Sequence, residues 1–206
     1  LFRSDLFISS THSYLLFFTS KGRLYWLKAL EIPDVGVSGR GKSIKNLLQL
    51  SPEEKVRSVV AVRDFSGDRY VVMITSKGRM KKTKLSDFRN IRRGGIIAIG
   101  LDRKSELLTA KLTDGQRDIL IGTKQGKAIR FKESEIRPMG RQAAGVKAIS
   151  LASKDEIIGM IVADPEDKFI FTASEKGYGK KTEISIYPRH RRGGKGVINL
   201  KINRKI

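Results

Sequence analysis

The chain repeats one short module four times, and this periodicity constrains its fold more than any single residue does. Each copy has an apolar run, a hydroxyl side chain, a glycine three residues later, and a basic run; the glycines are Gly22, Gly78, Gly126 and Gly177. They lie 56, 48 and 51 residues apart. A period near 50 residues is typical of radial or stacked arrays, in which each copy buries its faces against its neighbours.

A second glycine series supports the same repeat. It follows the first at an interval of 17 to 19 residues, and each member leads into an apolar run; its members are Gly41, Gly95, Gly145 and Gly196. The two series therefore divide the chain into repeats at about residues 5–50, 56–101, 106–151 and 156–202. No linker or change in composition separates them, so we predict a single domain over residues 1–206.

Each repeat is predicted to hold four short strands, with the first glycine in the left-handed turn of a hairpin. The predicted ranges are 6–9, 14–19, 23–28 and 43–48, then 59–62, 70–75, 79–84 and 96–99, then 107–112, 119–123, 127–132 and 146–151, then 157–162, 169–172, 178–182 and 197–202. The second strands are apolar on both faces, which is expected between neighbouring sheets. The pattern predicts an all-β, propeller-like fold of about four four-stranded antiparallel blades.

The charge of the chain points to a polyanionic partner. The 206 residues include 42 Lys and Arg against 21 Asp and Glu, a net charge of +21. Nucleic acid is favoured over a solvated basic surface. No apolar run approaches the roughly 18 residues of a membrane span, and no basic amphipathic helix is evident, so we predict no membrane partner. The chain has no cysteine, which excludes disulfides and fits a cytoplasmic protein.

The sequence shows no convincing catalytic site. Residues 36–43 read GVSGRGKS and match the phosphate-loop pattern GxxxxGK[ST], which requires a buried strand before it and a helix after it. The residues after this match align with a repeat strand, so we interpret the match as a coincidence. The two histidines, His12 and His190, are too few for a histidine metal cluster. We therefore expect a non-catalytic domain without a metal or cofactor.

Basic residues recur at matched positions of the repeats, which predicts a cationic stripe along the blades for a phosphate backbone. One, four and six residues after the hairpin glycine, these are Arg23, Arg79 and Lys127, then Lys82, Arg130 and Lys181, then Lys28, Lys84 and Lys132. The loops before the second glycine series add further candidates for DNA contact: Arg40, Lys42, Arg92, Arg93, Arg141, Arg189, Arg191, Arg192 and Lys195. RNA is disfavoured because no aromatic pair recurs on a matched column.

One of these loops carries a family resemblance. Residues 190–196 read HRRGGKG and resemble the box QRRGGKG of the DNA gyrase A subunit, with His190 in place of glutamine. The stretches STHSYLLFFTSKGRLYWLK, GKSIKNLLQL, GKAIRFKESEIRPMGRQAAGVKAISL and GYGKKTEISIYPRHRRGGKGVINLKI resemble successive blades of the C-terminal domain of that type IIA topoisomerase subunit. The similarity runs from about residue 6 to residue 202.

The resemblance implies a β-pinwheel, a propeller-like ring in which neighbouring blades exchange a strand. It also implies that the domain wraps double-stranded DNA around a basic rim to support negative supercoiling, alongside the N-terminal domains of the parent enzyme and the gyrase B subunit. The catalytic tyrosine and ATP site of that enzyme lie elsewhere. Family pinwheels usually have six blades and carry the box before the first, whereas this sequence has four repeats and the box in the fourth. These differences are consistent with either a partial ring or an open arc.

Three alternative interpretations remain. The A subunit of topoisomerase IV has a more degenerate version of the same repeats. A kelch-like protein-interaction propeller has a similar period, but its blades require a recurring Trp, and this chain has one Trp in total. An enzyme using the phosphate loop at residues 36–43 is the third alternative.

Overall fold

The structure is a computed structural model that describes residues 8–36, 39–92 and 94–202. The strands are β1 (Tyr14–Thr19), β2 (Arg23–Lys28), β3 (Val56–Val62), β4 (Tyr70–Thr75), β5 (Arg79–Lys84), β6 (Ile96–Ile97), β7 (Leu107–Thr113), β8 (Asp118–Thr123), β9 (Lys127–Lys132), β10 (Val146–Lys147), β11 (Ile157–Ala163), β12 (Phe169–Ala173), β13 (Gly179–Glu183) and β14 (Val197–Ile198). The helical elements among the described residues are 3-10 turns: η1 (Ala29–Glu31), η2 (Ile44–Asn46), η3 (Leu85–Phe88), η4 (Glu133–Glu135) and η5 (Ile184–Ile186).

The repeated module forms the hairpins β1–β2, β4–β5, β8–β9 and β12–β13. In each turn the glycine has a positive φ, between 70° and 83°. The hydroxyl three residues before it accepts a hydrogen bond from the backbone N–H of the residue after the glycine. For Thr75 and Arg79 this bond is 3.2 Å long, and the other three hairpins repeat it at 3.2 to 3.3 Å. The motif therefore encodes a closed hairpin turn.

Each of the first three hairpins is completed by strands from the following repeat. The sheet orders are β3-β1-β2-β6, β10-β5-β4-β7 and β11-β8-β9-β14, and β12 pairs with β13 alone among the described residues. A seven-residue strand covers the first strand of each complete hairpin, and a two-residue strand pairs with the second. Successive blades are consequently interlocked, as the resemblance implied.

Two members of the second glycine series, Gly145 and Gly196, are needed for this interlocking. A Cβ on Gly145 would lie 2.3 Å from the carbonyl oxygen of Met80, and a Cβ on Gly196 would lie 2.4 Å from that of Ala128. Both glycines also have positive φ. Only a residue without a side chain lets β10 and β14 come this close to the preceding hairpin.

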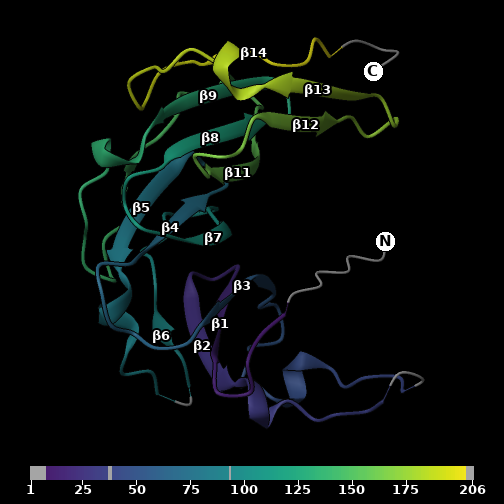
Figure 1. The fold of residues 1–206 in the computed structure, drawn as a ribbon, viewed down its shortest axis with the longest axis vertical. Coiled ribbons are helices and arrows are strands. Elements are labelled where there is room, and N and C mark those ends of the chain that lie inside the picture. Colours follow the sequence, from purple (N-terminus) through teal and green to yellow (C-terminus); the bar gives the residue numbers. More distant parts are fainter. Residues whose placement is uncertain (1–7, 37–38, 93, 203–206) are drawn as a thin grey trace.

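Apolar clusters between neighbouring blades form the core. Along β4, Val71 and Met73 belong to a cluster with Leu16 and Phe18 of β1, whereas Val72 and Ile74 belong to one with Ile119 and Ile121 of β8. Because alternate residues of a strand point to opposite faces, β4 is buried on both sides. This explains the continuous apolar runs in the sequence. In Figure 1 the blades follow an open arc, with β1–β2 at one end and β12–β13 at the other.

The predicted all-β pinwheel of antiparallel blades is confirmed, in the form of an open arc. The predicted strands at 96–99, 146–151 and 197–202 are shortened to the two-residue strands β6, β10 and β14. Two further predictions differ more. Residues 43–48 contain the 3-10 turn η2 instead of a strand, and residues 8–9 are not in a strand, while residues 6–7 lie outside the described residues. The first repeat differs because no upstream hairpin among the described residues offers its second strand to residues 43–48 as a partner.

Two glycines with the same backbone angle separate turn strain from packing. Gly67 and Gly126 both have φ +76°, but a Cβ would meet open space at Gly67 and would lie 1.9 Å from the carbonyl oxygen of Leu200 at Gly126. We expect Gly67→Ala to destabilise the fold by about 1–2 kcal/mol through left-handed strain alone. Gly126→Ala should cost about 1–3 kcal/mol more from overpacking. Equal losses in urea unfolding would contradict the close approach.

Candidate nucleic-acid interface

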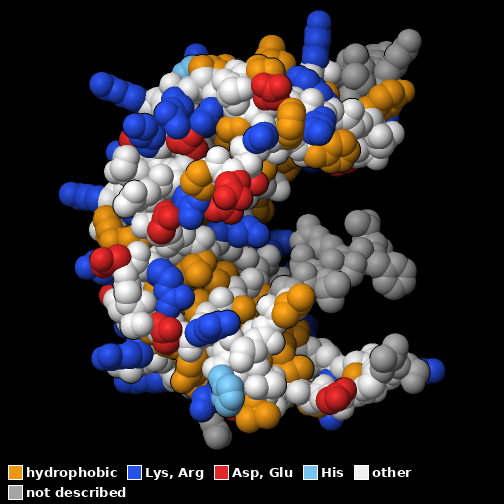
Figure 2. All heavy atoms as spheres, viewed as in Figure 1, with side chains coloured by type: hydrophobic (Ala, Val, Ile, Leu, Met, Phe, Trp, Pro, Cys, Tyr) orange, Lys and Arg blue, Asp and Glu red, His pale blue; other side chains and the backbone are white. Residues whose placement is uncertain are grey.

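In the structure, some side chains of the predicted basic columns are exposed to solvent, and others make contacts inside the protein. The column six residues after the hairpin glycine, Lys28, Lys84 and Lys132, is exposed at the ends of β2, β5 and β9. Figure 2 shows many Lys and Arg side chains standing out along the convex outer edge of the arc. This column is therefore available to a ligand on each of the three complete blades.

Most side chains in the column four residues after the glycine make contacts within the protein. Lys82 is 4% exposed, and its Nζ lies 3.5 Å from Glu133 Oε1 and 5.1 Å from the centre of the Tyr70 ring. Glu133 is fully buried and accepts a 2.6 Å hydrogen bond from the Thr113 hydroxyl. We exclude Lys82 from the interface, because contact with a phosphate would require breaking this buried pair.

Arg130, in the same column, is held between two blades. Its Nε donates to Asp118 Oδ2 at 2.9 Å and its Nη1 donates to the carbonyl of Ile184 at 2.8 Å. Arg189 donates to the same Asp118 oxygen at 3.1 Å. Burial raises the pKa of Asp118, but the hydrogen bonds from Arg130 and Arg189 outweigh it and hold the pKa below its usual value. Only Lys181 of this column is exposed, with Nζ 4.1 Å from the centre of the Phe169 ring.

The first column anchors loops of the next repeat. Arg23 Nη2 donates to the carbonyls of Gly94 and Gly95 at 2.5 and 3.3 Å. Arg79 donates in the same way to Ala144 and Gly145, at 3.4 and 2.8 Å. These arginines therefore hold the two loops that contain Gly95 and Gly145 of the second glycine series. Lys127, at the third repeat, is partly exposed.

The loop residues are mostly accessible. Arg40, Lys42, Arg92, Arg189, Arg191, Arg192 and Lys195 are exposed, Arg141 is partly buried, and Arg93 lies outside the described residues. Arg192 is also anchored: its backbone N–H donates to Glu135 Oε2 at 2.9 Å and its Nη1 donates to the carbonyl of Lys147 at 3.2 Å. This fixes the box-like loop against the preceding repeat.

Sequence reasoning missed two lysines. Lys147 is exposed on β10. Lys81 is fully buried on β5, three residues after the hairpin glycine, where the other repeats have Tyr25, Ile129 and Lys180. The apolar character of Tyr25 and Ile129 in this column was the available signal that Lys81 would point inward.

The phosphate-loop match has no helix behind it. Residues 39–43 are coil, and the single turn η2 comes next. Within the described ranges no group of three or more His, Cys, Asp or Glu residues could hold a metal ion. The same part of the chain contains no helix long and apolar enough to cross a membrane.

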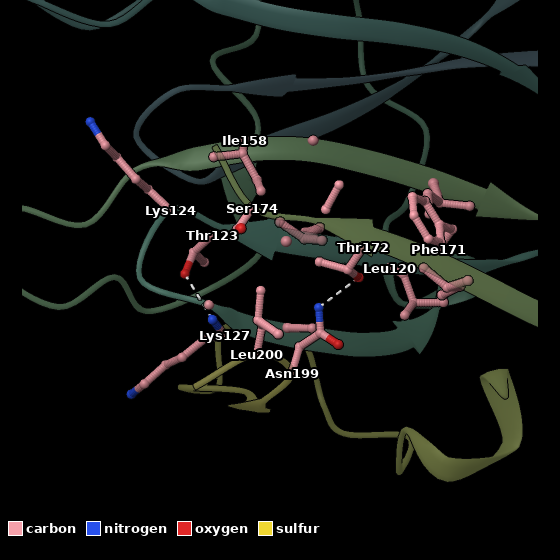
Figure 3. Close-up of a pocket in the computed structure, with 18 of the residues that line it drawn as sticks. Leu120, Thr123, Lys124, Lys127, Ile158, Phe171, Thr172, Ser174, Asn199 and Leu200 are labelled. Carbon is pink, nitrogen blue, oxygen red and sulfur yellow. Dashed lines mark hydrogen bonds between the residues drawn. The ribbon is translucent and has the colours of Figure 1, made fainter. Parts of the chain in front are cut away.

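A pocket of about 470 Å³ lies between the third blade and β12. Figure 3 shows its mainly apolar lining, including Leu120, Ile158 and Phe171, with Asn199 donating to the Thr172 hydroxyl at 3.0 Å. Lys124 and Lys127 point away from it. The pocket adjoins the two-stranded sheet, and its lining adds no basic side chain to the candidate DNA interface.

An arc of hairpins, interlocked by strands of the next repeat, defines a β-pinwheel-type domain. A family model described as the DNA gyrase C-terminal domain, β-propeller, matches residues 13–63, 69–114, 117–164 and 168–205. The chain therefore belongs to this family.

Curated relatives agree. The chain is 43% identical to the DNA gyrase A subunit of Haloquadratum walsbyi over 98% of its length and 24% of the relative's. It is also 43% identical to the Staphylococcus epidermidis protein of the same name, over 95% of its length and 22% of the relative's. The chain thus spans about a quarter of the length of these relatives.

Solved structures show the same arrangement. A topoisomerase IV C-terminal domain superposes with a TM-score of 0.84 at 29% identity, covering 91% of this chain and 58% of that one. A DNA gyrase A C-terminal domain gives 0.81 at 26% identity, covering 95% and 63%.

The buried pair gives a sharp test of which lysines are structural. We expect Lys82→Met to destabilise the fold by about 3–5 kcal/mol, because it leaves the Glu133 carboxylate buried without its partner. Lys84→Met removes the same charge at an exposed site and should change stability by less than about 0.5 kcal/mol. Denaturant unfolding of the two variants measures the difference. Similar stabilities would show that the pair is not essential to folding.

Proposed function

We propose that this chain is a non-catalytic domain that binds double-stranded DNA and wraps it around the outer edge of the arc. The observation that carries the proposal is the recurrence of exposed bases at equivalent positions of successive blades, above all Lys28, Lys84 and Lys132. The exposed loop bases extend the same cationic edge. A regular row of cations suits a phosphate backbone, which repeats its charge regularly.

The repeat also argues against base-specific recognition. Reading a sequence requires particular side chains at particular base edges, whereas matched lysines on each blade offer the same contact again and again. We therefore infer sequence-independent binding through phosphates. The residues proposed for contact are Lys28, Arg40, Lys42, Lys84, Arg92, Lys132, Arg141, Lys181, Arg189, Arg191, Arg192 and Lys195.

The interlocked blades supply the stiffness that wrapping needs. Bending 20–30 base pairs by 40–90° costs about 1–6 kcal/mol, which contacts along the protein must offset. A flexible string of basic modules would follow straight DNA instead. Here the first three hairpins share strands with the next repeat, and Arg23 and Arg79 anchor the intervening loops. These features support a curved template for the duplex.

We place the domain in the A subunit of a bacterial-type, cytoplasmic DNA gyrase, where it would support negative supercoiling. Its partners would be the gyrase B subunit and the N-terminal domains of the parent chain, which hold the reactive groups. The relatives of about 43% identity are gyrase A subunits. The A subunit of topoisomerase IV is the alternative parent, favoured by the superposition of 0.84 on a topoisomerase IV C-terminal domain.

Salt dependence tests the mode of binding. If about eight phosphates are neutralised, the slope of log affinity against log salt should be close to −7 for duplex DNA. Duplexes of the same length and different sequence should bind alike. A slope near zero, or strong preference for one sequence, would contradict phosphate recognition.

Bending tests the role of the box-like loop. Arg191 and Lys195 are exposed, and neither side chain has a hydrogen bond or ion pair among the described residues. We expect Arg191→Ala with Lys195→Ala to lower affinity for a short duplex modestly but to reduce bending of a longer duplex strongly, because the other bases still attract DNA. Energy transfer between dyes on the DNA ends measures bending.

The matched control removes two charges from the strand column, Lys84→Ala with Lys132→Ala, and so leaves the loop intact. Equal losses of bending in the two double variants would show that total charge matters and that the loop has no special role.

A further inference from the structure

Lys81 is a buried cation without an acidic partner among the described residues. Its side chain is fully buried on β5, and its Nζ donates to three backbone carbonyls: Ala98 at 2.5 Å, Gly140 at 3.1 Å and Arg141 at 2.5 Å. An ammonium has three hydrogens, so the three acceptors satisfy it completely. A lysine is almost never fully buried unless it is paired, and here the pairing is with main-chain oxygens alone.

The three carbonyls come from segments that meet around this side chain. Ala98 follows β6 and donates its own N–H to the carbonyl of the hairpin glycine Gly22 of the first blade at 2.8 Å. Gly140 and Arg141 belong to the basic loop of the third repeat. The N–H of Gly100 donates to the carbonyl of Ala143 at 3.1 Å, which joins the same segments a second time. Lys81 thus lies where three successive repeats touch.

The loop at residues 140–145 is held from both ends by cations of β5. Lys81 binds the carbonyls of Gly140 and Arg141, and Arg79 binds those of Ala144 and Gly145. Its carbonyls at these positions face the protein. In the first blade Arg23 likewise binds the carbonyls of Gly94 and Gly95, but the residue at the position of Lys81 is Tyr25 in the first blade and Ile129 in the third. Among the described residues, a buried lysine ammonium that binds this loop is found only at the second blade.

We propose that Lys81 is a positioning residue for DNA wrapping. It holds the loop at residues 140–145 in place, so that Arg141 contacts the phosphate backbone at a fixed position on the outer edge of the arc. The inference rests on the proposed function, since it assigns the loop a place in the DNA contact. Lys81 itself touches no DNA. It acts through three main-chain hydrogen bonds.

The protonation of Lys81 sets how many of these bonds form. Burial lowers the pKa of Lys81 to about 7; Asp87 opposes this shift and Arg141 adds to it. Below this pH the ammonium supplies three hydrogens, and above it the neutral amine supplies two for the same three oxygens. The loop is therefore held most firmly below pH 7 and loses one bond as the pH rises through about 7.

The free protein tests the loop without DNA. Backbone amide signals of Arg141 and Gln142 should shift with pH, with a midpoint near 7 in the wild-type chain. The transition should be absent in Lys81→Met. Because His12 and His190 are unchanged in the variant, the difference between the two titrations excludes them. Loop signals of Lys81→Met that are unchanged from those of the wild-type chain would overturn the proposal, whether or not DNA binds.

DNA bending then tests the consequence. We expect Lys81→Met to bind a short duplex within about twofold of wild type, since no exposed charge is lost, and to bend a longer duplex about three- to tenfold less well. The control Lys111→Met removes an exposed charge on β7 and should leave bending unchanged. Normal bending by a folded Lys81→Met chain would overturn the proposal. Failure of the wild-type chain to bend DNA would instead refute the proposed function.

Rescue is possible because the chain has no cysteine. In Lys81→Cys, alkylation of the unfolded chain with 2-bromoethylamine restores an ammonium at nearly the same reach, whereas an uncharged alkyl group of equal length does not. Recovery of bending only with the amine is expected. Equal recovery with both groups would show that Lys81 merely fills space.

Discussion

The pairing of each hairpin with strands of the following repeat is the constraint on which the rest of the structure depends. None of the three complete blades is built from its own repeat alone: β6, β10 and β14 each reach back to the preceding hairpin, and β3, β7 and β11 cover its other edge. Gly95, Gly145 and Gly196 of the second glycine series stand where this approach leaves no room for a Cβ. Since strand pairing fixes both distance and register, it also fixes each basic loop relative to the blade before it.

This constraint explains why the cations of the chain have two roles. Close approach brings main-chain carbonyls of a loop over the preceding blade, and buried carbonyls require donors. Arg23 and Arg79 supply them at the first and second blades, and Lys81 adds a buried ammonium. Lys82 and Arg130 hold buried or partly buried carboxylates. The remaining bases stand outside, where the anchored loops and strand ends set their spacing.

Much of the fold followed from the sequence, because glycine at positive φ and a hydroxyl three residues earlier are strict local requirements of the hairpin turn. Strand partners did not follow, since a two-residue strand such as β6 carries no periodicity that says which hairpin it joins. The site was predicted only in part. Lys82 and Lys84 both belong to the repeated basic pattern. Lys82 is buried because it pairs with Glu133, which follows a different hairpin, and the pattern does not reveal this contact.

The central claim is that the arc imposes a curved path on DNA and does not merely attract it. The most direct measurement is the linking number of nicked circular DNA sealed by ligase in the presence of the domain. The account predicts a shift of the topoisomer distribution in one direction that grows with the amount of bound protein. A distribution identical to that of protein-free circles, at concentrations that saturate the DNA, would contradict it.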